Sequence, residues 1–154
     1  MNAIDLLAPS VSHRFLVTFM INGIPDPLDI GFQRVSGLSR ELTVTPHRQG
    51  GDNARNLYLA DRIQHGTLSL ERGVMPVSPL TWTFNRVMSG AKVRYMDVII
   101  VVFDEFFVPA CNWVISNALP VQWRVGDLDA NSNSVLINHL ELRYQDLCWL
   151  GIRA

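Results

Sequence analysis

Short segments in which apolar and polar residues alternate recur along most of this chain, and this pattern constrains the fold more than any other feature. Clear examples are residues 14–22, 66–72 and 134–144. Side chains of an extended strand point alternately to its two faces, so a period of two predicts strands with one buried face. Turn residues such as Asn22-Gly23 follow these segments, which favours strands joined in an antiparallel arrangement.

Other segments extend this β pattern. We expect further strands over 33–45 with a break near Ser36-Gly37, over 92–104, over 111–117, and over 121–125 after a bend at 118–120. Val98–Phe103 is apolar at every position, which indicates burial on both faces. Residues 134–144 are expected to form the last strand.

Residues 79–90 change to the period of a helix. Ser78 is a candidate N-cap, Pro79 suits the first helical position, and Gly90 suits the C-terminal end. The apolar positions are Leu80, Phe84 and Val87. Six or seven strands and one helix predict a mainly β domain with one α-helix, built as an antiparallel barrel or sandwich.

Composition limits what the chain binds. Charged residues make up 18% and apolar residues 48% of the 154 residues, and the formal net charge is −1. With no basic excess to neutralise phosphates, sequence-specific nucleic-acid binding is not expected. So small a share of charged residues indicates that part of the surface is covered by other protein molecules. The alternative is a well-packed monomer. The apolar runs are too short to span a bilayer, so no membrane insertion is expected.

No motif predicts catalysis. The four histidines never fall at metal-ligand spacings, and no phosphate-binding loop or nucleophile motif is present. Asp127–Asn133 is similar to the start of a calcium loop, but Ser132 and Asn138 replace the glycine and glutamate that such a loop requires. We interpret it as a turn capped by its own side chains. No catalytic residue, metal or cofactor is therefore expected.

The end of the chain is unusually apolar. We expect residues 147–154 to form a tail outside the strands, with Trp149 and Leu150 docking onto a neighbouring protein. Trp82, Trp113 and Trp123 are expected to pack in the core.

The order of these landmarks resembles the tail-tube proteins of contractile phage tails and related contractile injection systems. The resemblance covers about residues 14–146. The matching segments are Phe15-Leu-Val-Thr-Phe19, Phe32-Gln-Arg-Val-Ser-Gly-Leu38 with Glu41, Gly50-Gly51, Leu68-Ser-Leu-Glu-Arg-Gly73, the helix with Trp82, Trp113-Val-Ile-Ser-Asn-Ala-Leu-Pro120 with Trp123, Leu128-Asp-Ala130 with Asn133, and Leu140-Glu-Leu-Arg-Tyr144.

This resemblance implies a non-enzymatic subunit of hexameric rings that stack into a hollow tube inside a contractile sheath. Each subunit would contribute strands to a barrel that lines the lumen, with the helix outside. The implied partners are further copies of the chain, the sheath, and baseplate or spike proteins. Assembly would take place in the bacterial cytoplasm, and the product would be a virion tail or a phage-tail-like particle, whose lumen could carry DNA, a toxin or nothing but a spike. The tube-like domain would span 1–146, including an arm over 1–13.

A tube subunit needs a segment that contacts the next ring and a face that lines the lumen, and the sequence offers candidates for both. Residues 46–62 are predicted to be a long loop, and loops of this length are often functional. The resemblance implies that it reaches an adjacent ring, through Gly50, Gly51, Asp52, Asn53 and Arg55. A barrel around an aqueous channel needs polar residues toward the lumen, and the candidates are Glu41, Thr43, Thr67, Ser69 and Glu71.

Three functions remain open from the sequence. The first is the repeating subunit of the inner tube. Slightly behind it stands a single-ring initiator or adaptor that joins the tube to the baseplate or spike, which would suit the apolar C-terminal end and the many arginines. A small enzyme or ligand-binding barrel is the remote third, because no constellation of polar residues supports it.

Overall fold

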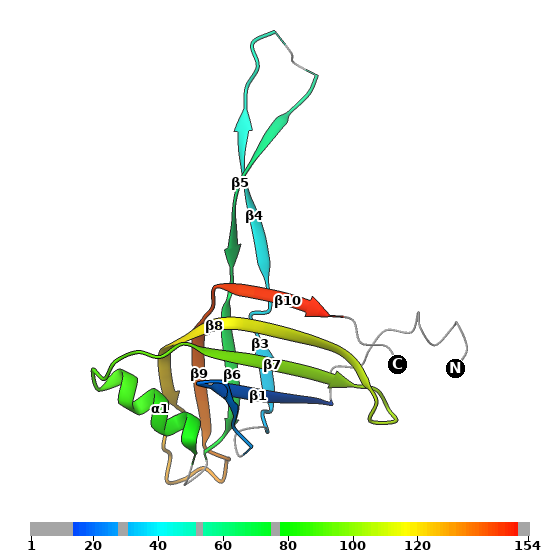
Figure 1. Cartoon of the computed structure of the whole chain (residues 1–154). Helices are drawn as coiled ribbons and strands as arrows, with labels where there is room; N and C mark the ends of the chain where they lie inside the picture. Colours follow the sequence, from blue (N-terminus) through cyan, green and yellow to red (C-terminus); the bar gives the residue numbers. More distant parts are fainter. Residues whose placement is uncertain (1–13, 28–30, 52–53, 75–77, 151–154) are drawn as a thin grey trace.

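The computed structural model describes residues 14–27, 31–51, 54–74 and 78–150 (Figure 1). These residues form ten strands and one helix, so the predicted mainly β class is confirmed. The elements are β1 (Phe15–Ile21), β2 (Ile24–Pro25), β3 (Arg34–Ser36), β4 (Arg40–His47), β5 (Leu57–His65), β6 (Thr67–Gly73), α1 (Pro79–Met88), β7 (Met96–Phe103), β8 (Pro109–Val125), β9 (Ile137–Arg143) and β10 (Asp146–Leu150). The predicted arm over 1–13 lies outside the described residues.

The strands form two antiparallel units. Eight strands make one sheet in the order β2-β1-β7-β8-β9-β6-β3, with β10 also paired to β8, whereas β4 and β5 form a separate hairpin. Every pairing between described strands is antiparallel. In Figure 1 the larger sheet folds over itself as the body of the molecule, and the hairpin stands away from it.

The long strand β8 connects the two halves of the sheet. Its first part pairs with β7 on one edge and β10 on the other, and its second part pairs with β9. The sequence predicted two strands separated by a bend at 118–120. The structure instead continues one strand of 17 residues, because residues up to Ala118 pair with β7 and residues from Leu119 onward pair with β9. Asn117 lies within this strand with a φ of 53°.

The core lies between the two halves of this sheet and α1. Alternate residues of each strand are buried there, as the period of two predicted, and they include Val17, Phe19, Leu68, Leu70, Val98, Ile100, Leu140 and Leu142. The expectation for Val98–Phe103 was wrong in one respect. Val98, Ile100 and Val102 are buried, while the residues between them are only partly buried.

The helix closes the core as its end signals predicted. The Ser78 side chain accepts a hydrogen bond from the amide of Thr81 at 3.1 Å, and Pro79 begins the helix. Leu80 and Phe84 point into the core and are fully buried. Gly90, with φ +87°, follows the C-cap Ser89 and ends the helix in the left-handed conformation that glycine tolerates.

Two predicted irregular segments are strands in the structure. The predicted loop over 46–62 is largely the β4–β5 hairpin, because residues 40–47 pair with 57–65. The predicted tail over 147–154 begins as strand β10, so 134–144 does not contain the last strand. Both errors have one physical cause. Each segment becomes a strand through pairing, β5 with the nearby β4 and β10 with the distant β8, and neither shows a regular alternation of buried and exposed residues.

Candidate functional site

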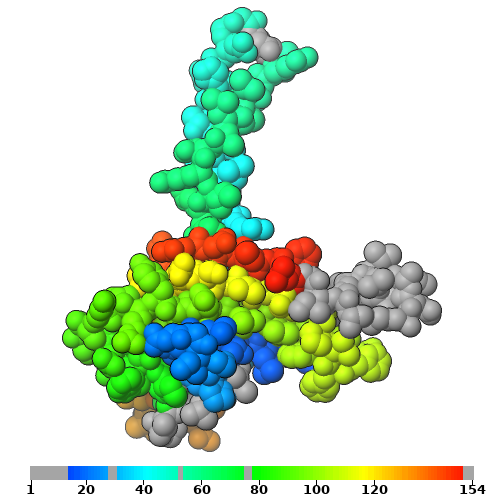
Figure 2. Space-filling model, in the orientation of Figure 1, coloured from blue at the N-terminus to red at the C-terminus, as the bar shows by residue number. Residues whose placement is uncertain are grey.

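The β4–β5 hairpin is the most exposed part of the molecule. It projects from the body with solvent on both sides (Figure 2). A two-stranded hairpin alone is at best marginally stable in water, and this one has large apolar side chains at half or more exposure. They are Leu42, Leu59, Tyr58 and Ile63, with Val44 and Leu57 just below half. Such an apolar surface marks an interface with other protein.

The tip of the hairpin carries the residues assigned to ring stacking. Gly50 and Gly51 lie there with open space around them, and Gly51 has φ +95°. Arg55 is exposed on the other side of the tip. Asp52 and Asn53 lie outside the described residues. The structure therefore gathers Gly50, Gly51 and Arg55 at the point furthest from the body, and their stacking role stays a prediction.

The base of the hairpin is held by residues close in space but far apart in sequence. The Tyr144 hydroxyl lies 2.8 Å from the carbonyl oxygen of Gly37 and 3.0 Å from that of Ser39. The Arg40 guanidinium donates to the carbonyl oxygen of Leu147 at 3.1 Å. His65 at the end of β5 meets the Tyr144 ring edge-on, with centroids 5.4 Å apart. The corner between β9 and β10 thus supports the hairpin.

A second surface is the polar face of β8, β9, β6 and β3. Thr67, Ser69 and Glu71 lie opposite Arg143, Glu141 and His139 of β9, with Leu68 and Leu70 between them facing the core. We name this surface the polar sheet face. The neighbouring strands add Arg34, Ser36, Gln122 and Arg124 by register.

The polar sheet face carries charges of both signs. Glu71 lies 3.3 Å from His139, and each side chain is about a quarter exposed. Of the five residues predicted to face a lumen, Thr67, Ser69 and Glu71 share this face. Glu41 and Thr43 do not, because they lie on β4 in the projecting hairpin. The sequence could not separate the two groups, since both segments show the same alternation.

A third surface surrounds strand β10. Trp149 is 62% exposed and faces its cross-strand neighbour Trp113, which is partly buried against the core. Leu150 is also exposed. Among the described strands, β10 pairs only with β8, so its other edge is free to pair. The predicted docking residues therefore sit on an open sheet edge, and docking itself stays a prediction.

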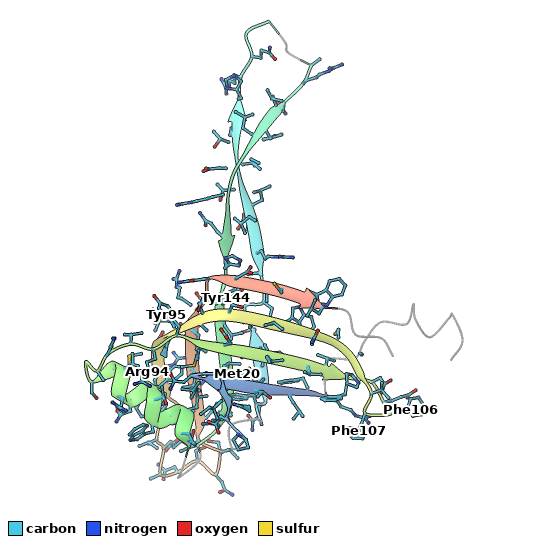
Figure 3. All side chains as sticks on the ribbon, in the orientation of Figure 1. Met20, Arg94, Tyr95, Phe106, Phe107 and Tyr144 are labelled. Atoms are coloured by element: carbon cyan, nitrogen blue, oxygen red, sulfur yellow. The ribbon has the colours of Figure 1, made fainter. Side chains whose placement is uncertain are left out.

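Exposed aromatic side chains also occur at two other places. The sequence predicted Trp82 to be buried, and it gave no role to Phe106 and Phe107. Trp82 was expected in the core, but it is 61% exposed on the outer side of α1, with the Arg86 guanidinium 4.8 Å from its ring centroid. Phe106 and Phe107 are exposed at the β7–β8 turn, marked in Figure 3. Phe106 and Phe107 lie between the expected strands over 92–104 and 111–117, and two adjacent phenylalanines in such a connection were the available sequence signal.

The exposed β7–β8 turn is stabilised by several hydrogen bonds. An Asp104 carboxylate oxygen accepts hydrogen bonds from the amides of Phe106 at 2.8 Å and Val108 at 2.9 Å. Arg14 donates to the carbonyl oxygen of Glu105 at 2.7 Å, and its guanidinium lies 5.0 Å from the Phe107 ring centroid. These bonds explain why Phe107 is held at a φ of +60°.

The next features are a possible metal site and the turn over residues 127–133, both judged on the part of the chain that the structure describes. This part contains no group of three or more His, Cys, Asp or Glu side chains that could hold a metal ion. The 127–133 segment is a turn, as predicted, in which Asp129 accepts from the amide of Asn131 at 2.9 Å. No helix in the described ranges is long and apolar enough to cross a membrane.

Comparison with known proteins adds a family and several structures. Residues 11–148 match the family described as T4-like virus tail tube protein gp19. No curated protein is detectably similar to the chain. A chain in the cryo-EM structure of the anti-feeding prophage (AFP) baseplate, 6-fold symmetrised, is 56% identical, with 96% of this chain and 99% of that chain covered and a TM-score of 0.89.

More distant structures share the fold. A chain in the cryo-EM structure of an extracellular contractile injection system, the PVC sheath–tube complex in the extended state, is 19% identical over 99% of both chains, with a TM-score of 0.80. Hcp1 from Flavobacterium johnsoniae is 11% identical over 88% of this chain and 95% of that chain, with a TM-score of 0.51. At such identities the likeness concerns the fold alone.

Proposed function

Since the chain belongs to the T4-like virus tail tube protein family, and is thus a structural tube protein of contractile injection systems, we propose that it forms a ring of six subunits at the baseplate end of the inner tube. This ring would start the tube and join it to the baseplate. The sequence alone placed this role slightly behind that of the repeating tube subunit.

One observation carries the choice between the two roles. Identity to the chain in the baseplate structure is far higher than identity to the chain in the sheath–tube complex, and both matches span nearly the whole chain. A protein repeated along a tube and a protein used once at its end meet different neighbours, so their surfaces diverge even when the fold is retained.

The three surfaces have complementary roles in this proposal. The polar sheet face lines the lumen, because an aqueous channel needs polar side chains backed by an apolar layer. The β4–β5 hairpin reaches the adjacent ring through its exposed apolar residues and its tip. The open edge of β10, with Trp149 and Leu150, meets the neighbouring subunit of the same ring, since a closed ring needs a head-to-tail contact.

The proposal extends to partners and location. The outer side of α1, with Trp82, would face the sheath, and the end of the ring away from the tube would face baseplate or spike proteins. Assembly in the bacterial cytoplasm and incorporation into a phage tail or phage-tail-like particle follow from this role. We propose no catalytic activity and no cofactor.

Electron microscopy with light scattering on the purified protein tests the proposed role. We expect rings of about 104 kDa, six times 17.4 kDa, or monomers that form rings when baseplate proteins are added. Long tubes formed by the protein alone would contradict the baseplate role and support the repeating subunit. Monomers that ignore every tube and baseplate partner would reopen the enzyme and ligand-binding alternatives.

A shortened hairpin tests the stacking contact. Thr45 and Leu59 face each other across the hairpin, so residues 46–58 can be replaced by Asn-Gly, which closes a two-residue hairpin turn. We expect a folded subunit that still forms rings but no longer binds the next ring. Normal stacking by this variant would exclude the hairpin tip as the stacking element.

A further inference from the structure

The hairpin joins the body through two short segments at its base, and these segments set the direction in which it projects. Among the described strands, β4 and β5 pair only with each other. The chain enters the hairpin through residues 37–39 and leaves it at Gly66. These two segments are in contact with each other. The Gly66 amide donates to the carbonyl oxygen of Ser39 at 3.0 Å, and a Cβ on Gly37 would lie 1.7 Å from the carbonyl oxygen of Thr67.

The Tyr144 side chain hydrogen-bonds to the segment that enters the hairpin. It is buried at the corner between β9 and β10, directly after β9, which pairs with β6 (Figure 3). Its hydroxyl donates to the carbonyl oxygen of Gly37 at 2.8 Å, with that of Ser39 at 3.0 Å as a second acceptor. It also accepts from the Ser39 amide at 3.3 Å. One oxygen therefore contacts three backbone groups of the segment that leads into β4.

The leaving strand is held by the same corner. The His65 ring packs against the edge of the Tyr144 ring, and His65 Nε2 lies 3.9 Å from a carboxylate oxygen of Asp146. Tyr144 thus touches the chain on both sides of the root of the hairpin. Its ring packs against β5, and its hydroxyl binds the segment before β4.

We propose that Tyr144 is a positioning residue whose hydroxyl fixes the direction in which the β4–β5 hairpin leaves the body. This inference rests on the proposed function, in which the hairpin must meet an adjacent ring. A nine-residue strand is about 30 Å long, so a tilt of about 10° at the root moves the tip by about 5 Å. A hairpin held in its bound direction loses less conformational freedom on binding than a swinging one.

The test uses Tyr144→Phe, which removes the hydroxyl and keeps the ring against His65. Tyr95→Phe is the matched control, because Tyr95 is exposed directly before β7, a strand that does not pair with the hairpin (Figure 3). Two measurements are made on the monomer. Hydrogen exchange follows the amides of Ser39 and Gly66 against the core amide of Val98. A spin label on Arg55→Cys, with Cys111 and Cys148 replaced by serine, reports the mobility of the tip.

We expect Tyr144→Phe to raise exchange at Ser39 and Gly66 about fivefold, the effect of losing one neutral hydrogen bond, with Val98 unchanged. The tip label should become more mobile, and ring stacking should weaken. Tyr95→Phe should change none of these. Unchanged exchange and tip mobility would overturn the positioning role. A mobile tip with normal stacking would retain the positioning role and overturn the proposed role of the hairpin in assembly.

Discussion

Gly37 packs so closely against Thr67 that a Cβ at position 37 would lie 1.7 Å from the Thr67 carbonyl oxygen. This contact joins the segment entering the hairpin to the first residue of β6. Gly37 also has φ +88°, a conformation that other residues avoid. Gly37 is the glycine of the Val-Ser-Gly-Leu segment, and the close contact together with the positive φ explains why that position requires glycine.

Gly37→Ala should therefore destabilise the subunit strongly. The positive φ alone costs about 1–2 kcal/mol for alanine. The overlap with backbone at Thr67 adds to this, because no flexible side chain can move aside. Thermal and urea unfolding of the monomer measure the loss. Gly23→Ala is the control, since Gly23 has φ +78° with open space around it and should show only the first cost. Equal losses for the two variants would contradict the role of close packing.

Ile63→Ser should weaken assembly while leaving the monomer nearly as stable. Ile63 is 59% exposed on the hairpin and faces Leu42 across it, so the monomer loses little buried area. If a neighbour covers it, the loss is about 1–2 kcal/mol per contact, a roughly tenfold rise in the concentration needed for assembly. Ile24→Ser, at the 70% exposed first residue of β2, is the control. An equal rise in that concentration for both variants would mean that the hairpin does not contribute more to assembly than other exposed apolar positions.

Trp149→Ala should reduce ring formation with a change in monomer stability below about 1 kcal/mol, because most of the side chain is exposed. Sedimentation of the subunit over a range of concentrations measures the association. Trp82→Ala is a matched change on the outer side of α1 and should leave ring formation intact. A ring that forms equally well without Trp149 would exclude β10 as the contact between subunits.

Ser69→Cys should be shielded in an assembled tube or ring if the polar sheet face lines a lumen. With Cys111 and Cys148 replaced by serine, a small maleimide should label Ser69→Cys, and a maleimide carried on a protein wider than the channel should not. Asn85→Cys, at an exposed position of α1, should react with both reagents. Ready labelling of Ser69→Cys by the large reagent would place the polar sheet face outside.

The candidate surfaces differ in how far sequence could find them. Thr67, Ser69 and Glu71 were identified because local alternation assigns them to the face opposite Leu68 and Leu70. Glu41 and Thr43 show the same alternation, yet they lie on a hairpin that leaves the sheet. Trp149 was recognised as a docking candidate without its strand, because β10 depends on pairing with residues 112–116 of β8.

The sequence by itself determined the mainly β class, the buried positions of β1 and β6, and both ends of α1. These features depend on neighbouring residues, through the periods of strand and helix and through the capping of Ser78. Only the tertiary structure decided that 40–47 and 57–65 form a projecting hairpin, that β8 runs unbroken, and that Tyr144 meets Gly37. The course of β8 and the Tyr144–Gly37 hydrogen bond depend on residues far apart in the chain, and the projection of the hairpin depends on β4 and β5 pairing with no other described strand. Local periodicity shows which residues of a strand share a face, but it does not show which strands pair.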